Sequence, residues 1–110
     1  MEHRDYFILE VIIEYCDQIL HSIEGLDLQK FSSDLDIRDA CALRALQIGE
    51  NAGDLSASFR EAHQEIDWRA IIGLRNIIAH EYGNVDTEVL WEIVSGDIPT
   101  LKARCAEILH

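Results

Sequence analysis

The sequence has few of the residues that interrupt helices, and it has no stretch suited to crossing a membrane. Its 110 residues include one proline, Pro99, and six glycines. A chain with so few helix breakers can form helices over most of its length. No apolar run approaches the roughly 18 residues of a membrane span, and Met1–Asp5 does not resemble the start of a signal peptide. We therefore expect a cytoplasmic protein with no membrane partner.

Basic residues are scarce as well. Nine Lys and Arg stand against 21 Asp and Glu, so the formal net charge is −12 and the sequence pI is about 4.6. A surface this acidic repels phosphate backbones, which excludes a general nucleic-acid coat protein. If the chain binds nucleic acid, we expect it to do so at a small, locally basic site.

Cysteines are few, odd in number and far apart: Cys16, Cys41 and Cys105. Each lies in an apolar stretch with helical periodicity. This pattern favours buried free thiols in a reducing compartment over a disulfide or a metal site. The histidines show no ligand spacing either (His3, His21, His63 and His110), so we expect no metal and no cofactor.

What the chain does have is helical periodicity throughout one domain, residues 1–110. Apolar residues make up 48% and charged residues 27%, a globular balance. The expected helices are 2–24, about 34–55 with N-cap candidates at Ser32, Ser33 and Asp34, 68–82 capped by Asp67 and stopped by Gly83, and one from Asp86 to the C-terminus. The last should break or kink at residues 95–99, and a short helix is expected near residues 59–63. The predicted fold is an all-α antiparallel bundle of about four main helices.

The first predicted helix has an unusually wide apolar face. Two adjacent stripes cover it, one through Ile8 and Ile12 and the next through Leu9, Ile13 and Cys16. A face this wide suggests burial on two sides, against the core and at an interface with a second copy of the chain. Gly49 and Gly53, on the second helix, and Gly73 would each allow a neighbouring helix to approach closely.

The third helix carries the one dense group of reactive side chains: Arg75, Asn76, His80 and Tyr82. At 100° per residue, Asn76 and His80 share a face, and Arg75 aligns with Tyr82. Arg75 and His80 are about 140° apart. Either Arg75 reaches around the helix, or the two groups converge only where two copies of this helix meet.

These residue types suit phosphate chemistry. Arg75 offers a permanent cation with a bidentate fork, and His80 can transfer a proton near neutral pH. Asn76 can orient the imidazole or bind a phosphate oxygen. RNA cleavage by its own 2′-hydroxyl needs little more than a base, an acid and a cation, and no metal. The alternative is structural: Arg and His near a helix C-terminus often only satisfy free carbonyls and the helix dipole.

The motif and its surroundings resemble a known family. Arg75-Asn-x-x-x-His80-x-Tyr82 resembles the Arg-x4-His-x-Tyr signature of the HepT-like branch of the HEPN superfamily. The segments Ile48–Ala52 and Trp68–Asn76 also resemble that family, as do Val85-Asp86 and Val89-Leu90-Trp91. The departures are Asn51, where alanine is usual, and the absence of a proline before the third helix. The resemblance covers nearly the whole chain.

The resemblance implies the ribonuclease toxin of a type VII-like toxin–antitoxin system. Such a toxin is a homodimer in which the Arg and His residues of two subunits form a metal-independent cleft for RNA. Its partner is a minimal nucleotidyltransferase antitoxin that inactivates it by AMPylation of the motif tyrosine, here Tyr82. Glu50 matches a family position near the cleft, where it either supports Arg75 or is only a surface carboxylate.

Two functions of different classes remain open from the sequence. One is the RNA-cleaving toxin, which the intact set of Arg75, Asn76, His80 and Tyr82 favours. The other is a non-catalytic helical dimer that binds a nucleotidyltransferase or a nucleotide, which the charge of −12 favours. Trp68 and Trp91 are expected to pack in the core or an interface instead of stacking on bases.

Overall fold

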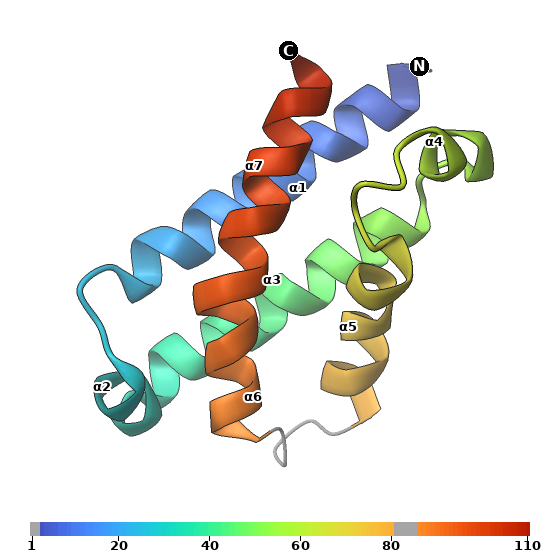
Figure 1. Ribbon diagram of the computed structural model, residues 1–110. Coiled ribbons are helices and arrows are strands. Elements are labelled where there is room, and N and C mark those ends of the chain that lie inside the picture. Colours follow the sequence, from blue (N-terminus) through green and yellow to red (C-terminus); the bar gives the residue numbers. More distant parts are fainter. Residues whose placement is uncertain (1–2, 81–85) are drawn as a thin grey trace.

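The chain forms an antiparallel arrangement of helices in the computed structural model, which describes residues 3–80 and 86–110 but not the side chains of Ala79 and His80. The long helices are α1 (His3–Ile23), α3 (Leu35–Gly53) and α5 (Trp68–His80), followed by the run from α6 (Thr87–Glu92) through η1 (Ile93–Asp97) to α7 (Ile98–Leu109). Figure 1 shows successive members of this set running in opposite directions. The predicted all-α class is confirmed, since no described residue lies in a strand.

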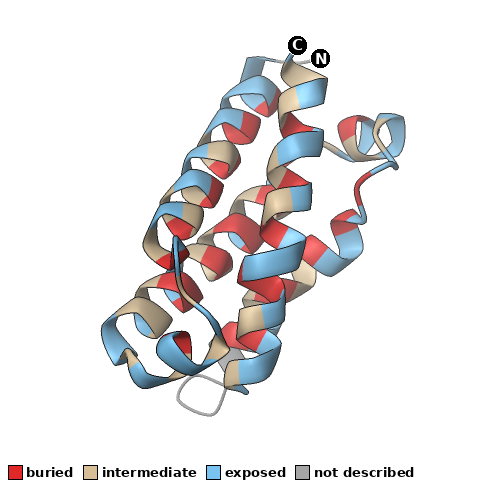
Figure 2. Ribbon diagram, turned by 60° about the vertical axis from the view of Figure 1, so that its left-hand side comes forward, coloured by how far each residue is buried: buried red, intermediate tan, exposed pale blue. Residues whose placement is uncertain are grey.

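The core lies where α1, α3 and α7 face one another, with α5 packed on α3. Buried residues face inward on each helix in Figure 2. They include Leu9 and Ile12 of α1, Ile48 of α3, and Ile98 of α7, all fully buried. Helix α1 is therefore held mainly by its apolar stripes. Ile13, Tyr15 and Leu20, on the outer part of its wide face, are only partly buried, and Phe7 is 64% exposed.

Aspartates at the expected positions begin the helices. The carboxylate of Asp34 accepts a hydrogen bond from Ile37 N (3.1 Å), and that of Asp86 accepts one from Glu88 N (2.8 Å). Both satisfy backbone N–H groups that a helix start leaves free. The predicted starts of these two helices are confirmed.

Two short helices join the long ones. Helix α4 (Ala57–Ala62) is the short helix expected near residues 59–63 and begins two residues earlier than expected. The sequence prediction missed α2 (Leu28–Ser33). Six residues are too few to show a helical period, and only Asp27, whose carboxylate caps Lys30 N at 2.9 Å, marks the start.

The helix is irregular where a break or kink is predicted, at residues 95–99. A π-helical turn, η1, occupies Ile93–Asp97 without ending the helix, and the N–H of Ile98 donates to the carbonyl of Ile93, five residues earlier. Pro99 supplies no N–H, so a regular helix here would leave a carbonyl without its partner. The hydroxyls of Ser95 and Thr100 donate to the carbonyls of Trp91 (2.6 Å) and Gly96 (3.2 Å). The wider turn and these hydroxyls let the helix continue.

The three cysteines are buried free thiols, as predicted. Burial raises the pKa of Cys16 and of Cys105 to about 12, and that of Cys41 to about 11. A thiol held protonated is a poor nucleophile. No helix of the described part of the chain combines the length and apolarity that crossing a membrane requires.

Candidate active site

Helix α5, which carries the motif, is fixed at its start by a side-chain cap. The Asp67 carboxylate accepts a hydrogen bond from Ala70 N at 3.1 Å, so the predicted cap is confirmed. Ile66 and Ile71, on either side of it, are both buried. The helix then runs to His80, which sets the rotational positions of Arg75, Asn76 and position 80.

Arg75 lies against two glycines of α3. A Cβ atom added to Gly49 would lie 2.9 Å from the Arg75 backbone N and 3.0 Å from the Ile71 carbonyl oxygen. A Cβ atom added to Gly53 would lie 2.9 Å from Nη1 of Arg75. Gly49 therefore lets the backbones of α3 and α5 approach closely, and Gly53 leaves room for the guanidinium. The expectation that these glycines admit a close neighbour is confirmed.

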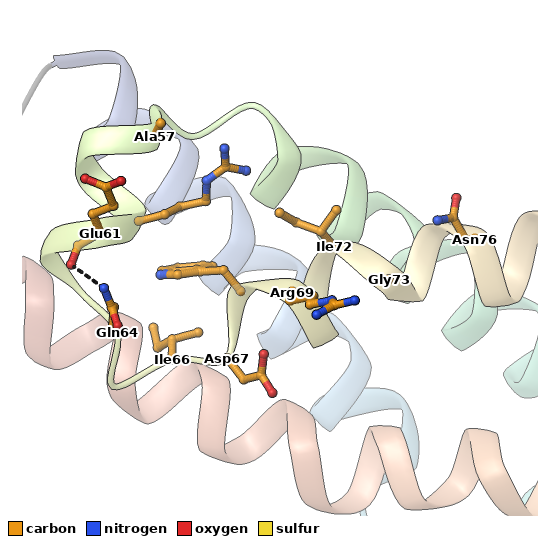
Figure 3. A pocket seen from close by; sticks show the side chains of 11 residues that line it. Ala57, Glu61, Gln64, Ile66, Asp67, Arg69, Ile72, Gly73 and Asn76 are labelled. Atoms are coloured by element: carbon orange, nitrogen blue, oxygen red, sulfur yellow. Dashed lines mark hydrogen bonds between the residues drawn. The ribbon is translucent and has the colours of Figure 1, made fainter.

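Asn76 lies on a different side of α5, in a groove. The groove has a volume of about 980 Å³ and runs between α4 and α5. The face of α5 that lines it is the stripe Arg69, Ile72, Gly73 and Asn76, and Figure 3 shows these residues along one side of the helix. No described atom outside α5 would lie within 4 Å of a Cβ atom added to Gly73. The groove is thus open beside the motif.

The structure separates the motif residues within one chain. Arg75 faces α3, whereas Asn76 faces the groove. Position 80 lies one helical turn beyond Asn76 on the same stripe of α5. The side chain of His80 is outside the described part, and so are Tyr82 and the predicted stop at Gly83. Because α5 is helical from Trp68 to His80, positions 75 and 80 lie on different faces of it, as the spacing predicted.

The other candidate residues lie apart from this group. Glu50 is exposed on α3, and no salt bridge joins it to Arg75 among the described side chains. Trp68 is buried and its indole N–H donates to the His63 carbonyl (2.9 Å), so its predicted packing role is confirmed. The ring of Trp91 lies 5.1 Å from that of Phe31. Among the side chains that the structure describes, which do not include that of His80, no three His, Cys, Asp or Glu form a metal-binding cluster.

Sequence analysis did not identify two further arginines near the motif. Arg60, from α4, and Arg69, from the first turn of α5, both line the groove that contains Asn76. Arg69 is seven residues before Asn76, a spacing that places both on one face of a helix. That signal was available for Arg69, but only the tertiary fold brings α4 and Arg60 to the same groove.

The comparison with protein families gives the family of the chain. A model of the family "Ribonuclease HepT-like" matches residues 12–108. The chain therefore belongs to that family of ribonucleases, and the resemblance to the HepT-like branch of the HEPN superfamily is confirmed.

Individual relatives match over most of their length. The chain is 32% identical to a "Putative RNase" of Caldanaerobacter subterraneus subsp. tengcongensis, covering 93% of this chain and 91% of the relative. It is 35% identical to a "Putative RNase" of Methanocaldococcus jannaschii, covering 83% and 84%. It is 36% identical to the "Probable ribonuclease HepT" of Thermococcus cleftensis, covering 93% and 91%. No solved structure matches the chain.

Proposed function

We propose that this chain is a metal-independent endoribonuclease toxin that acts as a homodimer. The observation that supports it best is the placement of the motif on α5. Asn76 lines an open groove, with Arg75 next to it on the helix, in an otherwise acidic chain that belongs to a ribonuclease family. In this proposal, the Arg and His residues of two subunits line one cleft, so the two groups need not meet on one side of a single helix, where positions 75 and 80 are about 140° apart.

The proposed reaction uses the RNA as its own nucleophile. His80 removes the proton of a 2′-hydroxyl, the 2′-oxygen forms a bond to the adjacent phosphorus, and the bond from phosphorus to the 5′-oxygen breaks. A protonated His80, from the second subunit, supplies the proton to the leaving 5′-oxygen. Arg75 stabilises the extra negative charge on the phosphorane, and Asn76 positions a phosphate oxygen or the imidazole. The products are a 2′,3′-cyclic phosphate and a 5′-hydroxyl.

Cleavage of RNA by the purified, unmodified protein tests this proposal. We expect activity in EDTA, products that end in a 2′,3′-cyclic phosphate, and a loss of roughly 100-fold or more in Arg75→Ala and in His80→Ala. Arg104→Ala and His110→Ala, exposed residues of the same types, should keep wild-type activity. Cleavage that stops in chelator and returns with magnesium would contradict the mechanism.

A non-catalytic helical dimer is the second candidate, and the charge of −12 favours it. Such a protein would bind a nucleotidyltransferase or a nucleotide without cleaving RNA. The same assay separates the two functions, because a protein that is folded and dimeric but leaves RNA intact at micromolar concentration fits only the second.

We further propose that a cognate nucleotidyltransferase antitoxin inactivates the toxin at Tyr82. The tyrosine oxygen would attack the α-phosphorus of ATP, forming a P–O bond while pyrophosphate leaves. The added phosphate charge and bulk, seven residues from Arg75, would repel RNA. This proposal depends on the sequence, since Tyr82 lies outside the described residues.

Intact-mass spectrometry tests the modification. With the antitoxin, ATP and magnesium, the mass should rise by whole AMP units of about 329 Da, the mass that one added phosphate ester of adenosine contributes. Tyr82→Phe should prevent the shift and keep the toxin active. Tyr6→Phe, a change of an exposed tyrosine of α1, should leave the shift unchanged. An equal shift in Tyr82→Phe would remove Tyr82 from the mechanism.

A further inference from the structure

The groove beside α5 contains more than the motif residue at its end. Two guanidinium groups line it, those of Arg60 on α4 and Arg69 on α5, together with the amides of Gln64 and Asn76. Figure 3 shows Arg69 and Asn76 along α5, with Gln64 across from them near α4. Arginine and amide side chains that face one open groove are the groups that bind phosphate and sugar oxygens.

Arg60 and Arg69 are available to a ligand, unlike several other cations of the chain. Lys102 pairs with Asp17 (2.6 Å), and Arg38 and Arg44 donate to oxygens of Ser32 and Ser22. Neither Arg60 nor Arg69 forms a salt bridge or side-chain hydrogen bond with any described residue. In a chain with nine basic residues and 21 acidic ones, these two cations lie in one groove.

Two carboxylates also line the groove, and one of them is already engaged. Asp67 caps α5 through Ala70 N. Glu61 is exposed on α4. Its negative charge opposes a polyanion, so Glu61 should weaken binding without abolishing it. Removing the Glu61 charge should therefore strengthen RNA binding, whereas removing Arg60 or Arg69 should weaken it.

The one aromatic residue that lines the groove, Trp68, offers no free face for bases. The ring of Trp68 is buried, its Nε1 bonds the His63 carbonyl, and Phe59 packs 6.0 Å from it. Recognition by stacking on Trp68 is therefore excluded. What the groove can hold is the sugar–phosphate backbone, which gives little base selectivity.

The register of α5 places the groove next to the reaction. Arg69 and Asn76 are seven residues apart, about 10 Å along the helix axis, and position 80 is another turn away. A phosphate at Arg69 therefore belongs to a nucleotide that flanks the one being cleaved.

We propose that the groove between α4 and α5 binds the backbone of single-stranded RNA that flanks the scissile phosphate, with Arg60 and Arg69 holding its phosphates. This inference rests on the proposed ribonuclease function and extends it from the motif to a substrate-binding site. It predicts that the protein gains affinity from strand length and not from base identity.

Binding of a fluorescein-labelled 2′-O-methyl RNA 12-mer, whose blocked 2′-oxygens prevent cleavage, tests the groove. We expect Arg60→Ala/Arg69→Ala to bind at least tenfold more weakly than wild type in fluorescence anisotropy. The slope of log K against log salt should also fall by roughly 0.7 for each phosphate of the single strand that the variant no longer neutralises. The matched control is Arg4→Ala/Arg104→Ala, which removes the same charge from exposed residues of α1 and α7 and should leave both values unchanged.

Two further variants give the sign of the effect. Glu61→Gln should bind the 12-mer a few-fold more tightly than wild type, and Arg69→Glu should bind it more weakly than Arg69→Ala. Cleavage of a dinucleotide should stay within about twofold of wild type in the control variant Arg4→Ala/Arg104→Ala, because these residues lie outside the groove. Circular dichroism and light scattering check the fold and the oligomeric state. If Arg60→Ala/Arg69→Ala does not fold, the two single variants Glu61→Gln and Arg69→Glu decide the test.

The outcomes separate this inference from the proposed function. Wild-type protein that neither binds nor cleaves RNA would overturn both. Wild-type cleavage with equal RNA binding by the groove variant and the control variant would overturn the groove alone. Conversion of Arg60→Ala/Arg69→Ala to a monomer would show that a second copy of the chain covers the groove, and would also overturn the proposal.

Discussion

At the residue scale, Gly49 and Gly53 leave space for different parts of Arg75, its backbone and its guanidinium group. The atoms nearest to an added Cβ at Gly49 are backbone atoms of α5, which cannot move without moving the helix. At Gly53 the nearest atom is the end of the Arg75 side chain, which can rotate away. The same substitution should therefore damage stability at one position and activity at the other.

We expect Gly53→Ala to lower RNA cleavage roughly 10- to 100-fold, since a misplacement of about 1 Å at a reacting group can cost that much. Its free energy of unfolding should change by less than about 1 kcal/mol, because alanine is tolerated in a helix. Gly49→Ala should instead lower the free energy of unfolding by about 1–3 kcal/mol through overpacking. Urea unfolding and initial cleavage rates measure the two effects. Full activity in a stable Gly53→Ala protein would show that the guanidinium position does not matter.

At the element scale, a buried carboxylate attaches α4 to the start of α1. Asp5 is 2% exposed and accepts hydrogen bonds from the backbone N (2.9 Å) and the hydroxyl (2.8 Å) of Ser56. The same hydroxyl caps α4 by accepting from Phe59 N (3.2 Å). The Asp5 side chain, in the first turn of α1, thus fixes α4, which forms the wall of the groove opposite α5.

Removing this carboxylate should loosen α4. Asp5→Ala leaves the Ser56 N–H without its acceptor, so we expect the free energy of unfolding to fall by about 1–3 kcal/mol, measured by urea unfolding. Glu10→Ala, a change of an exposed acidic residue of the same helix, should alter it by less than about 0.5 kcal/mol. Equal losses in the two variants would mean that the Asp5–Ser56 contacts add nothing beyond surface charge.

At the scale of the whole molecule, the placement of Arg75 and Asn76 on different sides of α5 favours a site shared by two chains. Light scattering should then give about twice the 12.6 kDa of one chain. In a symmetric dimer, one cleft on the two-fold axis would combine Arg75 and His80 of both subunits. A mass equal to one chain at micromolar concentration would contradict this arrangement.

Mixing wild-type and inactive subunits tests the shared site directly. Wild-type and His80→Ala subunits that exchange at random form heterodimers in about half of the molecules and wild-type dimers in about a quarter, by the symmetry of the pair. Because the proposed reaction needs a histidine from each subunit, we expect the refolded mixture to cleave RNA at about half the rate of the same two proteins mixed without exchange. An unchanged rate after exchange would show that each subunit acts alone.

Local patterns in the sequence predicted the long helices, their starts near Asp34, Asp67 and Asp86, and the buried thiols, because each depends on residues within a few turns. The motif on α5 was also found from local spacing, and the family from the resemblance of several segments. The helix α2 was missed because its six residues are too few for a helical pattern to be recognised. The irregularity predicted at residues 95–99 takes the form of a π-helical turn over Ile93–Asp97, which the sequence pattern did not specify.

The sequence by itself thus determined the helical class, the helix that carries the motif and the presence on it of residue types that suit phosphate chemistry. Only the tertiary structure decided what surrounds that helix. The contact of Arg75 with Gly53, the burial of Asp5 beneath Ser56, and the meeting of Arg60 with Arg69 all join residues from different helices. Such contacts depend on how helices pack, through the shapes of many side chains at once. A periodic pattern along one helix carries no record of its neighbour, which is why the groove could be recognised only in the folded chain.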